Sequence, residues 1–261
     1  MDFLTLPKRT SGIRTYGLTS VVDFGTPIGE LKNILADYSP YIDIAKIGIG
    51  SAVVTPNIKE KIELYRQYNI IPYCGGTLFE KCYYQNKLTE YQSYLNELGV
   101  NWVEISNGTI DIPLQERLHL ISLFKKDFHV ISEVGSKDCH KEMPISEWRK
   151  EIRLLLEAGC HYVITEGRDS GTSGIYEQCG NVKSDLIQEL LRDIDHNKII
   201  FEAPSAKHQM YFINEIGPNV NLGNVKLSDV LVLEAQRLGL RSETFYLEEH
   251  DAAYLNQTSS N

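Results

Sequence analysis

The sequence predicts a single (β/α)8 TIM-type barrel of the α/β class. Strand-like apolar runs alternate with helical patterns from one end of the chain to the other, and the alternation repeats eight times. No long linker or low-complexity stretch divides the 261 residues, a length that suits one barrel of about 250 residues. We therefore expect the barrel at residues 1–250 and a polar tail at residues 251–261.

Each expected strand is a short run rich in Ile, Val, Tyr or Phe. The runs are Leu18–Asp23, Ile42–Ile47, Ile70–Cys74, Trp102–Ile105, Val130–Val134, Tyr162–Glu166, Lys198–Glu202 and Asn219–Leu222. A doubly wound open sheet is the alternative architecture. No G-x-G-x-x-G motif opens the first helix, however, and that motif would favour the alternative.

Helical segments lie between these strands, because apolar residues recur there at spacings of three and four. The pattern is clearest over residues 58–65, 114–124, 148–155 and 186–194. Proline is favoured in a first turn, serine at an N-cap and glycine just after a helix, so such residues mark the helix ends. They are Pro27, Pro113, Ser146, Ser184, Gly99, Gly159 and Gly239.

The composition excludes several functional classes. A net charge of −9 and a pI near 5.3 provide no basic surface for a nucleic-acid backbone, although a local basic cluster could still bind a small anion. The five cysteines include no C-x-x-C pair, which argues against a disulfide framework or zinc knuckle and favours a reducing cytoplasm. No apolar run reaches the length of a signal peptide or membrane helix. We expect a soluble cytoplasmic protein without membrane or nucleic-acid partners, and a homo-oligomer is left open.

Charged residues stand at the C-terminal ends of the expected strands, where TIM barrels hold their active sites. Converging carboxylates repel one another unless cations lie among them, so a metal or basic side chains must offset their charge. Mg²⁺ is the natural candidate, because it prefers carboxylate and water oxygens and no His or Cys stands at the strand ends that carry the glutamates. The acidic residues are Glu104, Glu133, Glu166 and Glu202, and the basic ones are Lys46, Lys137 and Arg168.

Each of these residues also has a structural interpretation. A single glutamate at a strand end more often caps a helix or bonds to a loop than binds a ligand. The cations could pair with the glutamates, hold an anionic substrate, or do both. Two glycine-rich loops add to the anion hypothesis: residues 167–174 follow the sixth strand, and residues 220–224 contain Asn221 and Asn224 at the eighth, where barrels commonly bind phosphate.

These motifs together resemble the phosphosulfolactate synthase family, over a stretch from about Gly17 to Phe245. Six strand-end motifs occur in the order of that family, which makes the resemblance specific. The segments are 75–80 (GGTLFE), 104–108 (EISNG), 132–137 (SEVGSK), 166–171 (EGRDSG), 201–204 (FEAP) and 220–224 (VNLGN), and 239–241 (GLR) follows them.

The resemblance implies a barrel enzyme that joins sulfite to phosphoenolpyruvate with the help of Mg²⁺. Sulfite would attack C3, the negative charge would move onto the carboxylate, and Lys137 would protonate C2 as general acid to give 2-phospho-3-sulfolactate. Mg²⁺ held by Glu104, Glu133, Glu166 and Glu202 would act as a Lewis acid. The substrate anions would be bound by Lys46, Arg168, Asn221 and Asn224.

This chain departs from the family at a few positions. Gly12-Ile13-Arg14 replaces a usual Lys-Pro-Arg, residues 47–51 (IGIGS) replace a common Phe-Gly-Trp-Gly-Thr, Asp169 stands for Glu, and Glu243 stands for Asp. The alternatives are therefore a divergent barrel lyase or Schiff-base aldolase acting on another small anionic substrate, or a non-catalytic barrel that binds a metabolite.

Overall fold

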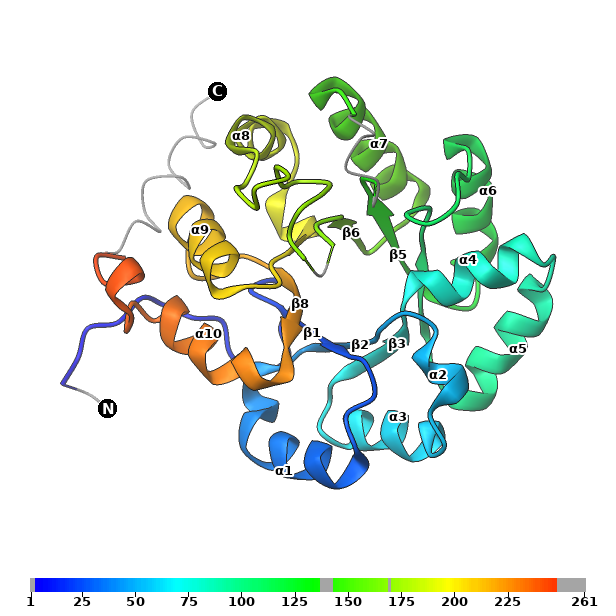
Figure 1. Cartoon of the computed structure of the whole chain (residues 1–261), viewed down its shortest axis with the longest axis horizontal. Helices are drawn as coiled ribbons and strands as arrows, with labels where there is room; N and C mark the ends of the chain where they lie inside the picture. Colours follow the sequence, from blue (N-terminus) through cyan, green and yellow to red (C-terminus); the bar gives the residue numbers. More distant parts are fainter. Residues whose placement is uncertain (1–2, 137–142, 169, 248–261) are drawn as a thin grey trace.

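The computed structural model describes residues 3–136, 143–168 and 170–247 and shows a closed barrel of eight parallel strands (Figure 1). Each strand pairs with the next along the chain, and the last pairs with the first, which confirms the predicted (β/α)8 architecture. The strands are β1 (Thr19–Asp23), β2 (Ile44–Ile47), β3 (Ile71–Cys74), β4 (Trp102–Ile105), β5 (His129–Val134), β6 (Tyr162–Thr165), β7 (Ile199–Glu202) and β8 (Leu222–Lys226). The predicted tail at 251–261 lies outside the described residues.

The predicted position of the eighth strand was wrong by several residues. The strand covers Leu222–Lys226, whereas we expected Asn219–Leu222. Thr19 pairs with Leu222 and Val21 pairs with Val225, so Gly223 and Asn224 together stand opposite Ser20 in a β-bulge. Asn224 has a φ of 53°, a conformation that Asn tolerates better than most residues. Glycine and asparagine thus indicated a loop in the sequence, but they form the bulge of a strand.

Helices cover the outside of the barrel (Figure 1). They are α1 (Ile28–Tyr38), α2 (Ser51–Val54), α3 (Ile58–Gln67), α4 (Gly76–Tyr84), α5 (Leu88–Leu98), α6 (Leu114–Phe124), α7 (Ile145–Ala158), α8 (Ser184–Asp193), α9 (Ala206–Ile216) and α10 (Val230–Arg237), with 3-10 turns η1 (Ser39–Tyr41), η2 (His196–Lys198), η3 (Leu227–Asp229) and η4 (Ser242–Thr244). In the described part of the chain, no helix combines the length and apolar character needed to cross a membrane.

The helix ends follow the sequence signals in most cases. Gly99 and Gly159 cap α5 and α7 in the left-handed conformation, and Pro27 immediately precedes α1. The expected N-caps at Ser146 and Ser184 were wrong, because α7 and α8 have already begun at these residues. At α7, Pro144 precedes the helix and lets it start one residue earlier than Ser146.

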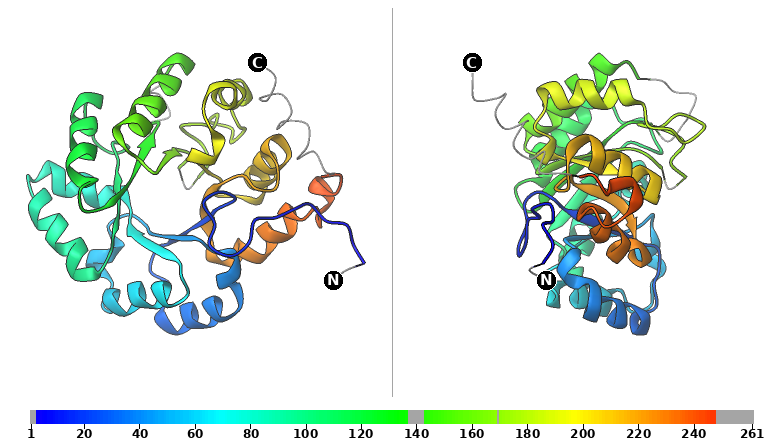
Figure 2. Two further views of the ribbon diagram at one scale, coloured as in Figure 1. Left: turned by 180° about the vertical axis from the view of Figure 1, so that it is seen from behind. Right: turned by 90° about the vertical axis from the view of Figure 1, so that its left-hand side faces the viewer.

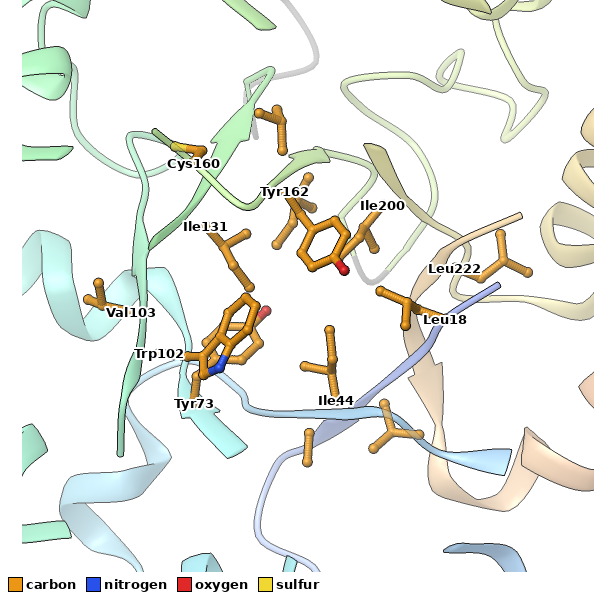
Figure 3. Close-up of a cluster of buried hydrophobic side chains, with 14 of the residues drawn as sticks. Leu18, Ile44, Tyr73, Trp102, Val103, Ile131, Cys160, Tyr162, Ile200 and Leu222 are labelled. Carbon is orange, nitrogen blue, oxygen red and sulfur yellow. The ribbon is translucent and has the colours of Figure 1, made fainter. Parts of the chain in front are cut away.

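The interior of the barrel is filled from its N-terminal end by apolar side chains. Figure 3 shows Ile44, Tyr73, Ile131 and Ile200 gathered inside the ring of strands. Each is at most 1% exposed. Because side chains on a strand alternate between its two faces, the residue two positions after an inward apolar residue also points inward. This alternation directs the charged residues nearer the C-terminal ends into the barrel mouth.

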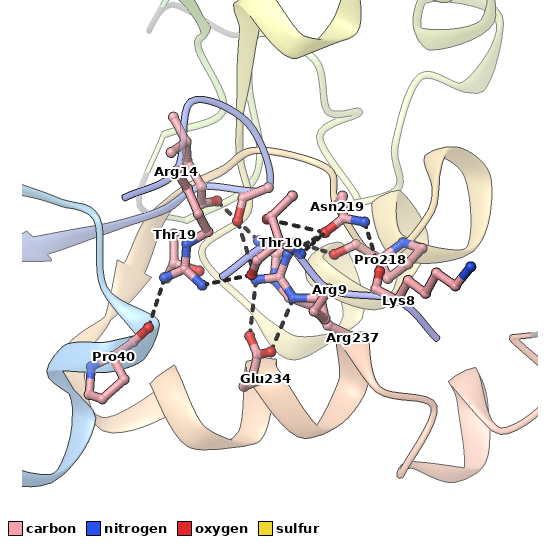
Figure 4. A network of polar contacts seen from close by, with 12 residues as sticks. Lys8, Arg9, Thr10, Arg14, Thr19, Pro40, Pro218, Asn219, Glu234 and Arg237 are labelled. Atoms are coloured by element: carbon pink, nitrogen blue, oxygen red, sulfur yellow. Dashed lines mark hydrogen bonds and ion pairs between the residues drawn. The ribbon is translucent and has the colours of Figure 1, made fainter. Parts of the chain in front are cut away.

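The opposite end of the barrel is closed by the N-terminal segment, which crosses this face beside α10 (Figure 2). Arginines fasten the segment and the last helix (Figure 4). Arg14 Nε donates to Asp43 Oδ1 over 2.8 Å, and Arg9 Nε donates to Glu234 Oε1 over 3.1 Å. Buried Arg237 donates to the carbonyl oxygens of Leu18, Val220 and Pro218. These partners precede the strands or lie on α10, so the network seals the N-terminal end.

Candidate active site

The predicted glutamates converge at the C-terminal end of the barrel. Glu104 and Glu133 are the penultimate residues of β4 and β5, Glu166 follows β6 directly, and Glu202 ends β7. Each lies two residues after an inward apolar residue, such as Ile131 before Glu133, and therefore shares its inward face. All four side chains are buried, with exposed fractions of 1% or 2%. The four strand ends thus place a strongly acidic group in one mouth.

Lys46 on β2 spans this mouth. Its Nζ lies 2.9 Å from Oε1 of Glu202 on β7, although β1 and β8 separate the two strands in the ring. Burial disfavours the charged form of Lys46, but Glu202 and Glu104 outweigh that penalty and raise its pKa well above the ordinary value. Lys46 is therefore a fixed cation within the acidic group.

Backbone N–H groups from adjacent loops hold the carboxylates in place. Gly76 N donates to Glu104 Oε1 over 3.0 Å, and Gly167 N donates to Glu202 Oε2 over 2.9 Å. A Cβ atom at residue 76 would lie 2.3 Å from Glu104 Oε1, so only glycine permits this approach. With Lys46 on its other oxygen, Glu202 has protein donors on both carboxylate oxygens. The site is pre-organised by the chain itself.

Sequence reasoning missed Glu80, which supports the mouth from helix α4. Its Oε2 accepts the N–H groups of Thr109 and Ile110, each over 2.7 Å, and its Oε1 accepts the hydroxyl of Ser106 over 2.9 Å. Ser106 Oγ also lies 3.2 Å from Glu133 Oε1. Glu80 was part of a recognised motif, but it lies within a helix, where a search of strand ends does not find it.

Tyr73 on β3 is a second missed residue of the site. Its side chain lies below the carboxylates and is 1% exposed. Burial raises its pKa well above the ordinary value, and the charge of Glu104, to which it is hydrogen-bonded, adds to the increase. Tyr73 therefore stays protonated as a donor to Glu104. Its inward position follows from its pairing with Lys46 across β2 and β3.

Several buried polar atoms near the C-terminal ends of the strands have no hydrogen-bond partner among the described residues, and three of them lie on segments of interest here. They belong to Asn107 (Oδ1), Ser173 (Oγ) and Asn224 (Oδ1), on the segments that follow β4, follow β6 and form β8. Buried polar atoms are normally satisfied, so such atoms mark places for water, an ion or a ligand. Asn224, a predicted substrate residue, thus lies at the mouth with an oxygen available to a ligand.

Asn221 is in a different place from the one predicted. It precedes β8, at the N-terminal end of the barrel. Its amide nitrogen donates to the carbonyls of Asn197 and Ile199 over 2.9 and 3.0 Å, and its Oδ1 accepts the N–H of Leu18. The expectation that it lies at the C-terminal end of a strand was wrong, because the strand begins where we had expected it to finish. Asn221 links strand starts at the closed end.

The remaining predicted cations lie near the glutamates in sequence. Arg168 is two residues beyond Glu166, has a φ of 60°, and donates its backbone N–H to Glu166 Oε1 over 2.6 Å. Lys137 lies outside the described residues and directly follows Ser136, two residues after the end of β5. The structure thus brings together Lys46 and Glu202 by direct contact and places Arg168 beside Glu166.

The donor set of the mouth fits Mg²⁺. Its candidate ligands are carboxylate and amide oxygens, which a hard cation prefers, and Asn224 Oδ1 is buried without a partner among the described residues. Within that part of the chain, no group of three or more His, Cys, Asp or Glu is assembled to hold a metal. Mg²⁺ is commonly bound by one or two carboxylates together with water and substrate phosphate, so a sparse protein ligand set suits it.

Comparison with solved structures shows the same fold in distant proteins. The chain superposes on 3-keto-L-gulonate-6-phosphate decarboxylase from Vibrio cholerae with a TM-score of 0.53, over 89% of this chain and 99% of that chain at 11% identity. For 3-hexulose-6-phosphate synthase from Salmonella typhimurium the TM-score is 0.51, over 84% and 98% of the two chains at 12% identity. Identities this low support the architecture alone.

Sequence comparison is more specific. The family described as (2R)-phospho-3-sulfolactate synthase (ComA) matches residues 7–243. The phosphosulfolactate synthase of Bacillus subtilis is 42% identical over 94% of this chain and 99% of its own length. That of Methanocaldococcus jannaschii is 41% identical over 88% and 94% of the two chains. With matches of this identity and coverage, the chain belongs to the phosphosulfolactate synthase family.

Proposed function

We propose that this protein is a carbon–sulfur lyase that adds sulfite to phosphoenolpyruvate in a Mg²⁺-dependent reaction. The observation that carries the proposal is the buried ring of glutamates around Lys46 at the barrel mouth, in a chain of this family. Both substrates are anions, and a fixed buried cation with further cations on neighbouring loops suits them. The acidic residues in turn suit a divalent cation.

The chain's own residues divide the work as follows. Lys46, Arg168 and Asn224 bind the substrate anions, and Glu202 orients Lys46 and keeps it charged. One or two of Glu104, Glu133 and Glu166 would hold Mg²⁺ together with water and substrate phosphate, and the ion would supply positive charge near the substrate when bound. We assign Glu202 to Lys46 and not to the metal, because both of its oxygens already accept protein donors.

The reaction needs one new bond and one proton transfer. The sulfur lone pair of sulfite forms the bond to C3 of phosphoenolpyruvate, and the electron pair of the C2–C3 double bond moves toward C2 and the carboxylate. Lys137 then donates a proton to C2, which completes 2-phospho-3-sulfolactate. Lys46 and Arg168 oppose the negative charge that accumulates in between, which is where electrostatic stabilisation contributes most to the rate.

The direct test is phosphorus NMR of the protein incubated with phosphoenolpyruvate, sulfite and Mg²⁺. We expect a new phosphorus signal that appears only when all three are present, disappears with EDTA, and returns with added Mg²⁺. Full turnover after rigorous chelation would remove the metal from the reaction. The glutamates would then serve only as partners of the basic residues.

A Schiff-base aldolase is the competing enzyme class. Imine formation needs a neutral amine, whereas Lys46 is held as an ammonium ion by Glu202. Borohydride reduction in the presence of a carbonyl substrate distinguishes the two classes. Covalent trapping on a lysine would support the aldolase, and its absence together with the sulfite adduct would support the proposal.

A further inference from the structure

Two aromatic rings pack against each other behind the glycine-rich loop that joins β6 to α8. Tyr176 belongs to the loop and His208 to α9, and their ring centroids are 4.1 Å apart with an interplanar angle of 30°. Both side chains are buried, with exposed fractions of 1% and 5%. Neither ring has a role in the proposed chemistry, so their burial beside the mouth needs another explanation.

Tyr176 connects the start of this loop to the end of β7. Its hydroxyl donates to the carbonyl oxygen of Glu202. Its ring lies against Gly167, where a Cβ atom would approach Cε2 of the ring to 2.5 Å. Gly167 N in turn donates to Glu202 Oε2 over 2.9 Å. The ring therefore holds the backbone of residue 167 against the carboxylate that orients Lys46.

His208 supports the loop on the other side of Arg168. Its Nε2 lies 3.0 Å from the carbonyl oxygen of Gly180, so Nε2 carries the proton, and burial lowers the pKa and favours the neutral ring. A Cβ atom at Gly171 would lie 2.2 Å from His208 Cε1. Gly171 N donates to the carbonyl oxygen of Arg168 over 3.0 Å. The imidazole thus contacts the residue that is hydrogen-bonded to Arg168.

These contacts also explain the glycines of the loop. Gly167 and Gly171 leave space for the two rings, and a Cβ atom at Gly174 would lie 1.9 Å from the carbonyl oxygen of Glu166. Gly171 and Gly174 have φ values of 64° and 62°, which glycine adopts without strain. Close packing by itself accounts for glycine at these positions.

We infer that Tyr176 and His208 are positioning residues that set the backbone of Arg168 at the barrel mouth, through Gly167 and Gly171. The inference rests on the proposed function, in which Arg168 binds a substrate anion. It gives a part in the affinity for the anion to two residues that act only through the position of Arg168. It also predicts that their effect on binding depends on the presence of the Arg168 side chain.

A double-mutant cycle with Arg168 tests this dependence. We expect His208→Ala to weaken phosphoenolpyruvate binding, measured by calorimetry with Mg²⁺, by about tenfold in the wild-type background. In an Arg168→Ala background the same change should have almost no further effect. Tyr176→Phe should also weaken phosphoenolpyruvate binding only when Arg168 is present, but by a smaller factor. His208→Gln keeps an N–H donor and should therefore lose less affinity than His208→Ala.

A matched control separates positioning from general stability. His196→Ala removes a partly buried histidine remote from the mouth, in η2 at the closed end. This change should lower the melting temperature without changing phosphoenolpyruvate affinity. The inference is overturned if His208→Ala lowers only the melting temperature, or if its effect on affinity adds fully to that of Arg168→Ala.

Hydrogen exchange gives a measurement that does not depend on the identity of the substrate. His208→Ala should speed amide exchange at Gly171, while Gly76, which is bonded to Glu104, keeps its wild-type rate. Unchanged exchange at Gly171 would contradict the inference even if phosphoenolpyruvate is not the ligand. Failure of the wild-type protein to bind phosphoenolpyruvate, with faster exchange in the variant, would contradict only the proposed function.

Discussion

The two ends of this barrel both bury charge, but they satisfy it in different ways. At the closed end, Arg14 pairs with Asp43 and Arg237 donates to backbone carbonyl oxygens. At the mouth, the buried carboxylates of Glu202, Glu104 and Glu133 act on Lys46, and Asn224 keeps a buried oxygen without a partner among the described residues. At the closed end arginines bond mainly to backbone carbonyl oxygens, whereas at the mouth several carboxylates converge on one lysine.

This contrast shows that burial of charge alone does not identify an active site. A buried guanidinium with several carbonyl partners has the fixed geometry of a structural support, because each bond joins two segments of backbone. Buried carboxylates that converge in one place are costly unless cations lie among them. The kind of partner therefore separates the two ends: backbone carbonyl oxygens at the structural end and converging carboxylates at the functional end.

The largest effect on catalysis is expected from Lys137→Ala. As the proposed general acid, this residue should contribute about 10²-fold or more to kcat, with a smaller change in phosphoenolpyruvate binding. Steady-state kinetics and thermal unfolding on the same variant provide the measurement. A change confined to KM would make Lys137 a binding residue, and a normal kcat in the folded variant would end its assignment as the acid.

At the closed end the largest effect should be on stability. Arg237→Met removes the donors to three buried carbonyl oxygens, so we expect a loss of about 2–4 kcal/mol in the free energy of unfolding. The kcat of the folded fraction should stay near the wild-type value. Urea unfolding followed by kinetics at low urea checks both parts. A large loss of kcat without a loss of stability would mean that the closed end takes part in catalysis, which contradicts the assignment of function to the mouth.

A smaller effect should follow from Arg14→Ala. Its side chain bonds to Asp43 and to the carbonyl oxygen of Pro40, so we expect a loss of about 1 kcal/mol in stability and no change in substrate preference. The departure from the family at residues 12–14 then belongs to the closed end. The departure at residues 47–51 follows β2 at the mouth and is the one able to affect substrate choice. Competition between sulfite and other small anions, measured in Arg14→Ala, checks that substrate preference is unchanged.

Mild acid should produce the smallest change. Burial is the main cause that lowers the pKa values of His161, His196 and His208 below the ordinary 6.5. Below about pH 6.5 these histidines are protonated in the unfolded chain but stay neutral in the folded chain. The free energy of unfolding therefore falls as the pH drops from about 6.5, and it levels off below the pKa values of the folded state. Unfolding midpoints measured from pH 7.5 to 5 check the direction. A midpoint that rises with acid would contradict the burial of these rings.

The sequence was sufficient to predict the ring of strands and most of the mouth. A period of two along each strand, with an apolar residue followed two positions later by glutamate, directs Glu133 and Glu202 inward once the barrel is assumed. Lys46 follows from the same rule on β2. The positions of these residues at strand ends agree with the sequence-based expectation because they depend on the common geometry of the fold, and their roles in binding stay predictions.

The errors arose where tertiary contacts decide. The bulge at Gly223 and Asn224 resembles a loop in sequence, so the eighth strand was predicted too early. Asn221 therefore lies at the closed end of the barrel and not at the mouth where it was predicted. Glu80 was missed because its partners, Thr109 and Ile110, are remote in sequence from α4. No spacing rule predicts a carboxylate that reaches from a helix to the next loop.

The most direct test of the difference between the two ends is phosphoenolpyruvate affinity in two matched variants, Lys46→Met and Arg237→Met. Each replaces a cation that is mostly or fully buried by an unbranched apolar side chain, and folding is confirmed for both by near-UV circular dichroism. We predict that Lys46→Met weakens binding measured by calorimetry by about 10²-fold, because a charge-assisted contact is lost, whereas Arg237→Met binds as the wild-type protein does. Wild-type affinity in folded Lys46→Met would contradict the assignment of the mouth as the substrate site.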